Sequence, residues 1–170
     1  AKEQLLGALG RGEGDLAAPG ELFDPATVRN VVATAPVRDQ VALVLVGRKG
    51  ERAFSQAEQL SGRTIALTSA SAAGPLIEQL NQRLAMRKRP PVKVEWVDPT
   101  LAIEDVLEMV QAGIYHLTVV EQPIARRWSK VMPKLRVNLR VHLGPSQAMR
   151  WYVGRDSPQL QALVDRFLQN

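Results

Sequence analysis

Residues 64–71 read Thr-Ile-Ala-Leu-Thr-Ser-Ala-Ser, a short apolar run that gives way directly to small polar residues. The run Thr64–Leu67 predicts a buried β-strand, and Thr68–Ser71 predicts the loop that follows it. Pro75 then stands near the start of a helix whose apolar residues share one face. These residues are Leu76, Ile77, Leu80 and Leu84. The stretch therefore predicts a strand–loop–helix unit of an α/β fold.

Strands and helices alternate outward from this unit in both directions. Upstream, Val41–Val46 is a continuous apolar run, which is typical of a strand covered on both faces. The alternation predicts a mostly parallel sheet flanked by helices. The other predicted strands are at 15–18, 92–97, 117–120, 135–143 and 149–153, and the other predicted helices are at 5–9, 26–30, 103–110, 124–128 and 157–168. The last helix is expected to begin with Ser157 as N-cap and to present an apolar face made of Leu160, Leu163, Val164, Phe167 and Leu168.

The composition fits a globular protein of one domain, or of one lobe with pieces of another. The chain has 170 residues, of which 45% are hydrophobic and 23% are charged. It contains no cysteine, which excludes disulfides, Cys-ligated zinc and thiol nucleophiles. No apolar run in the sequence is long enough to cross a bilayer. Because the chain lacks both an initiator Met and a signal-peptide pattern, we expect a processed piece whose export signal has been removed.

The net charge of +5 raises the question of an anionic partner. The charge is spread along the chain, and only Arg87-Lys88-Arg89 forms a tight run. Such a run is usually a solvated basic surface, which is the favoured interpretation, and the alternative is attraction to anionic cell-wall polymer or to nucleic acid. No nucleophile elbow, P-loop, GxGxxG or HExxH motif is present. We therefore expect no catalysis, no cofactor and no metal site in this chain.

Small polar residues follow the first predicted strand. In parallel sheets, ligands bind beyond the carboxyl ends of the strands, which directs attention to the loop Thr68–Ser71. The hydroxyls of Ser69 and Ser71 lie beside a helix N-terminus, where a ligand carboxylate would be favoured. A plain N-cap loop is the more common role for such residues, and both interpretations stay open.

A carboxylate ends the buried strand predicted at 117–120. Glu121 would point toward the same edge of the sheet and could hold a ligand ammonium group. The alternative is that Glu121 caps the next helix or pairs with Arg126 or Arg127, since such surface pairs are common. The sequence therefore makes Ser69, Ser71 and Glu121 the candidate ligand-binding residues.

The tryptophan and histidine side chains have plainer expected roles. Trp96, Trp128 and Trp151 could stack on a sugar or a peptide, but packing is the favoured role of tryptophan. His116 and His142 stand alone, without the partner spacing of a metal site, so both are expected to be structural.

Four stretches, in order, resemble the type II periplasmic binding proteins. Leu6–Ala18 is similar to that family's "L…L..G..D.A..G" stretch, and Val41–Gly50 looks like its first hinge strand. Leu60–Leu67 is similar to the "L.GK.I.V" opening of the second lobe, and Glu104–Glu121 resembles a segment that ends near an acidic position. The resemblance implies a two-lobed α/β ligand-binding fold.

Within that family the likeness is strongest to the non-catalytic N-terminal domain of membrane-bound lytic transglycosylase F. Leu22–Asp24 before Val28–Asn30 fits its pattern, and Ser146–Trp151 resembles its "QP..W" stretch. This resemblance implies a regulatory module in the periplasm that binds a small polar ligand, such as an amino acid or a peptidoglycan peptide. The implied partners are a lysozyme-like catalytic domain of the parent protein, which could also be membrane-anchored, and cell-wall polymer. No nucleic acid is expected in this interpretation.

The resemblance also divides the chain. It implies one complete α/β lobe, the second lobe, at 41–144, and an incomplete first lobe at 1–40 and 145–170. The first lobe lacks its opening strands, and an unpaired sheet edge there would allow a homodimer. Thr27 stands where amino-acid-binding relatives have an Arg that clamps the ligand carboxylate, and Val37 stands where the family has an aromatic residue. The identity of the ligand is therefore left open.

Two other interpretations stay open. The effector-binding domain of a LysR-type transcription regulator shares this fold and the hinge pattern, and it would be cytoplasmic and joined to a DNA-binding helix-turn-helix. A degenerate lobe used only for protein contacts would keep the fold without a ligand. A signal peptide upstream would favour the periplasmic module, and a helix-turn-helix would favour the regulator.

Overall fold

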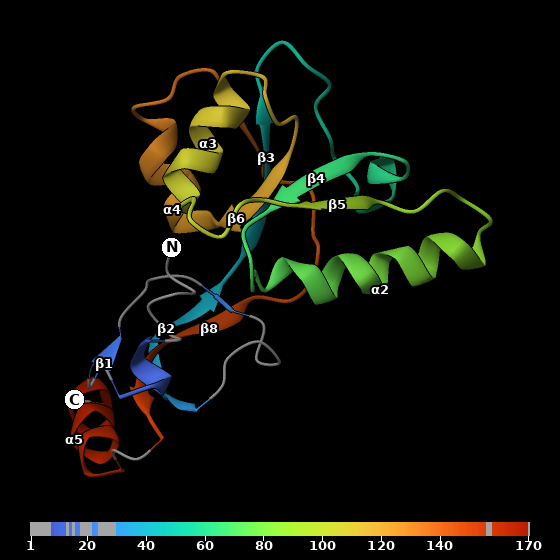
Figure 1. The fold of residues 1–170 in the computed structure, drawn as a ribbon. Helices are drawn as coiled ribbons and strands as arrows, with labels where there is room; N and C mark the ends of the chain where they lie inside the picture. Colours follow the sequence, from blue (N-terminus) through green and yellow to red (C-terminus); the bar gives the residue numbers. More distant parts are fainter. Residues whose placement is uncertain are drawn as a thin grey trace.

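The computed structural model describes residues 8–12, 14, 16–17, 22–23, 30–155 and 158–169. Thr27, Ser157 and all but the last residue of the predicted helical turn at 26–30 lie outside them. Within the described chain the strands form two sheets, one of five strands and one of three. Figure 1 shows the two sheets as separate bodies, with β2 and β8 rising side by side from the smaller toward the larger.

The five-stranded sheet has the order β5 (Lys93–Trp96), β4 (Thr64–Leu67), β6 (Thr118–Glu121), β3 (Leu43–Arg48) and β7 (Leu135–Asn138). β4 is parallel to β5 and to β6, whereas β3 is antiparallel to both β6 and β7. The predicted α/β fold class is confirmed, but the sheet is mixed rather than mostly parallel. The reason is that β3 enters this sheet from β2 at the edge where β6 ends, with Leu43 paired to Glu121, so that it runs opposite to β6.

Helices cover both faces of this sheet. On one face, α2 (Ala73–Met86) and the 3₁₀ helix η2 (Ala57–Leu60) pack over a core that includes Ile65 and Leu67. On the other face, α3 (Ile103–Gln111) and α4 (Gln122–Ser129) pack over a core that includes Val44 and Val46 (Figure 1). Because β3 is covered on both faces, its residues have no polar alternation, as the sequence predicts.

The three-stranded sheet is antiparallel throughout. Its order is β1 (Leu16–Ala17), β8 (Gln147–Gly154) and β2 (Val31–Val41), and α5 (Pro158–Gln169) packs on β2. The sequence does not predict β2, because Pro36 cannot donate a ladder hydrogen bond and the apolar pattern is broken around it. The pairing with β8 shifts register on both sides of Pro36, as expected where a strand tolerates proline.

Two predicted strand boundaries differ from the structure, one at the start of a strand and one at the end of a strand. The strand predicted at 41–46 begins at Leu43, since Val41 is the last residue of β2. The strand predicted at 135–143 ends at Asn138, whose side chain is buried and bonded to main chain on both sides.

The predicted apolar face of the C-terminal helix is only partly buried. In α5, Val164 is buried, whereas Leu163 and Phe167 are 60% and 71% exposed. The helical pattern thus predicts the helix correctly but not how much of its apolar face is covered.

No helix of the described chain has both the length and the apolar character needed to cross a membrane.

Candidate functional site

The two candidate loops leave the same edge of the larger sheet. β4 and β6 are parallel neighbours, with Ala66 paired to Thr118. The buried hydroxyl of Thr118 donates a 2.7 Å hydrogen bond to the main-chain oxygen of Ala66, which fixes this register. Parallel strands end on the same side, so the loop Thr68–Ser71 and Glu121 lie next to each other at their carboxyl ends.

The loop Thr68–Ser71 is a tight turn that leads into α2. The main-chain N–H of Ser71 donates to the oxygen of Thr68 at 3.2 Å, and Ala70 adopts a φ of 63°. The hydroxyl oxygen of Ser71 accepts the N–H of Ala73, the first residue of α2, at 3.2 Å, so Ser71 supplies the capping hydrogen bond from one residue before the N-cap position at Ala72. The hydroxyl of Ser69 is half-buried and makes no hydrogen bond to the described part of the chain.

Glu121 is a buried carboxylate with an unexpected partner. Its side chain is 6% exposed, and Oε1 accepts the main-chain N–H of Leu22 at 2.6 Å. Glu121 is the N-cap residue of α4, yet its side chain makes no capping hydrogen bond to that helix. Of the two alternatives left by the sequence, helix capping is therefore wrong.

A single segment contacts both candidate loops. Phe23 forms an isolated antiparallel bridge with Ser71, and its neighbour Leu22 binds Glu121. Leu22 also packs with Val41 and Ala72, in a small apolar cluster that Met149 and Val37 complete. Two consecutive residues, Leu22 and Phe23, thus contact Glu121 and Ser71 respectively.

From the sequence, Leu22–Asp24 is identified only by a family resemblance, and its contacts with Ser71 and Glu121 are not predicted. Leu22 and Glu121 are 99 residues apart in the sequence. Because the donor is a main-chain N–H, which nearly every residue has, the identity of the residue at position 22 does not indicate the contact. Val37, which stands in place of an aromatic residue, is partly buried against the cluster around Leu22. Thr27 and Arg29 lie outside the described residues.

Comparisons with known proteins show which proteins and folds this chain resembles. No protein-family model matches the chain. The chain is 29% identical over 170 residues to membrane-bound lytic murein transglycosylase F of Ectopseudomonas mendocina (strain ymp), a match that covers 98% of the chain and 33% of that protein. It is 38% identical over 146 residues to virulence sensor protein BvgS of Bordetella bronchiseptica, a match that covers 85% of the chain and 11% of BvgS. The chain thus spans a third or less of the length of these curated relatives.

Solved structures match more of their own length. The crystal structure of the substrate binding protein of an amino acid ABC transporter superposes with a TM-score of 0.77 at 17% identity, over 98% of this chain and 69% of that chain. An ancestral arginine-binding protein bound to arginine superposes with a TM-score of 0.74 at 18% identity, over 99% of this chain and 70% of that chain. The chain has the type II periplasmic-binding-protein fold. The resemblance stated from the sequence is confirmed.

In this periplasmic-binding-protein fold, the smaller sheet contributes an aromatic contact to the segment Leu22–Phe23. The rings of Phe23 and Tyr152 meet edge to face, with centroids 6.0 Å apart. Burial raises the pKa of Tyr152 above its ordinary value, and the nearby Arg150 opposes that shift. Tyr152 is therefore a neutral packing residue behind the segment that contacts Ser71.

One tryptophan near the site is not a core residue. Trp96 ends β5, next to the carboxyl end of β4, and is 55% exposed, so the expectation that it packs in the core is wrong. Its ring lies against the first turn of α2, where a Cβ on Gly74 would come within 3.1 Å of Cη2. By contrast, Trp128 is partly buried against the core beneath α3 and α4.

The remaining candidate for charge chemistry lies away from this edge. His116 Nδ1 lies 3.4 Å from Glu51 Oε2, and the His116 side chain is 68% exposed. Among the described residues, no group of three or more His, Asp or Glu side chains could hold a metal ion.

Proposed function

We propose that this chain is a non-catalytic ligand-binding module that takes a small polar ligand between its two sheets, at Ser69, Ser71 and Glu121. The observation that carries the proposal is the buried carboxylate of Glu121, at the end of β6, which accepts the main-chain N–H of Leu22, a residue 99 positions away in the sequence. A buried carboxylate is costly unless it is hydrogen-bonded, and its two oxygens can accept several donors. A ligand ammonium or amide N–H is therefore the chemistry that Glu121 favours.

The contact with Leu22 supports a ligand with peptide-like or amino-acid-like character. The group that Glu121 binds is a main-chain N–H, and the group that pairs with Ser71 is the main chain of Phe23. A peptidoglycan peptide presents main-chain N–H donors of the same kind in extended form, and an amino acid presents the N–H donors of its ammonium group. Such a ligand would add to the contact with Leu22 or replace it.

The division of the chain into lobes follows from this proposal. We take 41–144 as the complete lobe, since it holds the five-stranded sheet and both candidate loops. Residues 1–40 and 145–170 then form the incomplete first lobe, whose sheet has β1 and β2 as its edge strands. A homodimer through this incomplete lobe would cover one of those edges.

The curated relatives support a regulatory role in a larger protein. Lytic murein transglycosylase F and BvgS are both much longer than the stretch that resembles this chain. We propose that the module reports ligand occupancy to another domain of its parent protein, such as a lysozyme-like domain acting on peptidoglycan. This role places the module in the periplasm.

Calorimetric titration with L-arginine, L-glutamine and a muropeptide tests the proposal. Saturable heat is expected with at least one of them. Glu121→Gln should weaken that binding by about tenfold or more, because a hydrogen bond to a charged group contributes about 1.5–3 kcal/mol. The control His116→Gln changes an exposed residue outside the site and should leave the affinity unchanged. No heat with any of the three, or equal affinities for Glu121→Gln and wild type, would overturn it.

A further inference from the structure

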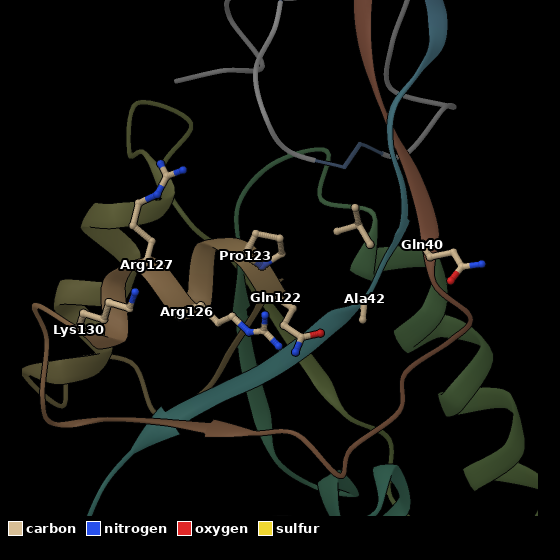
Figure 2. A pocket seen from close by; sticks show the side chains of 8 residues that line it. Gln40, Ala42, Gln122, Pro123, Arg126, Arg127 and Lys130 are labelled. Carbon is tan, nitrogen blue, oxygen red and sulfur yellow. The ribbon is translucent and has the colours of Figure 1, made fainter. Parts of the chain in front are cut away.

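A concave site lies beside the junction of β2 and β3. It has a volume of about 540 Å³, and its walls come from Gln40, Val41 and Ala42 on one side and from α4 on the other (Figure 2). Neither the loop Thr68–Ser71 nor Glu121 lines it. Pockets of this size hold small molecules in many proteins, so we consider it as a site of its own.

α4 and its C-cap residue supply three cations to this pocket: Arg126 and Arg127 from the helix and Lys130 from the C-cap position. Arg126 and Lys130 lie four residues apart and Arg127 and Lys130 lie three apart, which makes them neighbours on the helix surface. The helix dipole favours cations in a last turn, but like charges at this spacing repel one another. Within the part of the chain that the structure describes, no carboxylate lines the pocket or forms an ion pair with any of the three.

The other polar groups of the pocket add further donors. Each guanidinium presents a planar fork of N–H groups, and the side-chain amides of Gln40 and Gln122 can also donate. In Figure 2, the guanidinium of Arg126 and the amide of Gln122 extend together from α4 toward β3. Val41, Ala42 and Pro123 supply apolar surface beside them. The pocket therefore suits an oxyanion attached to a small, less polar remainder.

A pocket at the other end of β3 is also rich in cations and serves as a comparison. That pocket, of about 530 Å³, contains three arginines, but it includes the carboxylate of Glu51. Two of its arginines, Arg52 and Arg63, lie over the ring of Phe54 at 5.4 and 5.7 Å. Its cations are thus already partly engaged, whereas no ion pair or ring contact to Arg126, Arg127 or Lys130 is found among the described residues.

We propose that the pocket between α4 and the β2–β3 junction binds a phosphate group, carried by a small phosphorylated molecule or by a lipid headgroup. Three cations facing a single carboxylate would leave two charges uncompensated, whereas a phosphate monoester carries nearly two negative charges at neutral pH. Arginine forks match phosphate oxygens in pairs, which lysine alone does not. The site goes beyond the proposed ligand cleft, although α4 begins one residue after Glu121.

Titration of the chain with inorganic phosphate, at constant ionic strength set with chloride, tests the site. Saturable binding is expected, with shifts of the Nε–H resonances of Arg126 and Arg127. The triple variant R126Q/R127Q/K130Q should weaken phosphate binding by about tenfold or more. The matched triple R87Q/K88Q/R89Q removes the same charge from an exposed surface and should change it by less than about twofold. R126K/R127K keeps the charge but loses the forks, and should weaken binding by about threefold.

Vesicles distinguish the two sources of phosphate. Binding to vesicles that contain phosphatidic acid, whose headgroup is a phosphate monoester, but not to phosphatidylcholine vesicles, lost in R126Q/R127Q/K130Q, supports a lipid headgroup. Phosphate binding without vesicle binding supports a small phosphorylated molecule. Absence of saturable phosphate binding, or equal weakening in the two triple variants, overturns the site. Glu121→Gln should not alter phosphate binding. The experiments can therefore reject the proposed ligand site at Glu121 and the proposed phosphate site independently of each other.

Discussion

The main-chain N–H of Leu22 lies 2.6 Å from Oε1 of Glu121 and donates a buried hydrogen bond to it. The carboxylate proposed to hold a ligand is thus already bonded to the chain itself. Phe23 pairs with Ser71 in the same stretch, so both proposed contacts are bridged by one segment. Main-chain groups of Leu22 and Phe23 therefore already contact the residues proposed to bind the ligand. A ligand has to bind beside this segment or displace it.

This link predicts different costs for two substitutions of Glu121. Glu121→Ala leaves the buried N–H of Leu22 without its acceptor, and should lower the free energy of unfolding by about 2 kcal/mol. Glu121→Gln keeps a carbonyl oxygen at that position and should cost only about 1 kcal/mol. Urea unfolding measures both, with the exposed Glu78→Ala as control. A cost for Glu121→Ala no larger than that of Glu78→Ala would rule out the hydrogen bond as a stabilising contact.

The two serines of the loop should also differ. The hydroxyl oxygen of Ser71 accepts the N–H of Ala73, so Ser71→Ala should destabilise the chain by about 1 kcal/mol, as loss of a helix cap does. Ser69→Ala removes no hydrogen bond within the described chain and should stay within about 0.5 kcal/mol of wild type. Thermal unfolding of the two variants measures the difference, and equal costs would show that Ser71 does not act as a cap.

The sequence predicts those strands and helices whose apolar pattern is complete within their own consecutive residues. Thr64–Leu67 and the helix after it were predicted because each buries its own contiguous apolar residues. β2 was missed because Pro36 interrupts it and its pairing with β8 supplies the order. The mixed direction of the sheet was missed because it depends on how β3 enters from β2.

The same distinction between local patterns and long-range packing applies to the candidate site. The sequence places Ser71 and Glu121 at neighbouring strand ends, and the pairing of β4 with β6 brings those ends together. The contact with Leu22 could not be predicted, because it depends on how two distant parts of the chain pack. The pocket beside α4 was not predicted for a similar reason, since its wall formed by Gln40–Ala42 comes from another strand.

Gly74 and Trp96 form a contact that fluorescence can follow. A Cβ at Gly74 would lie 3.1 Å from Cη2 of Trp96, a ring that is 55% exposed and has room to move. Gly74→Ala should therefore raise stability by up to about 1 kcal/mol through helix propensity, while it displaces the ring. The tryptophan emission should shift to the red, and the shift should vanish in G74A/W96F. A loss of stability in Gly74→Ala would mean that the ring cannot move.

Two asparagines that bridge main-chain groups make a matched pair. The buried Asn138 accepts the N–H of Phe54 at 2.9 Å and donates to the oxygen of Leu45 at 3.3 Å. The half-buried Asn81 binds both main-chain groups of Val92, at 2.7 and 2.9 Å. Water can replace the amide of Asn81 more easily, so Asn138→Ala should cost about 2 kcal/mol and Asn81→Ala about 1 kcal/mol. Urea unfolding tests the order, and a larger cost at Asn81 would contradict it.

Tyr152 should make stability depend on alkaline pH. Burial raises the pKa of its phenol above the ordinary value of 10.0, so the folded chain holds the proton more tightly than the unfolded chain does. The stability this provides is fully present below about pH 10 and is lost as the pH rises through the folded-state pKa. The unfolding free energy of the wild type should therefore fall more steeply above about pH 10 than that of Tyr152→Phe. Tyrosinate absorbance gives an independent check, since the chain has two tyrosines and the variant leaves only Tyr115 to titrate. Parallel stability curves for wild type and Tyr152→Phe across this range would show that the phenol titrates alike in the folded and unfolded chains.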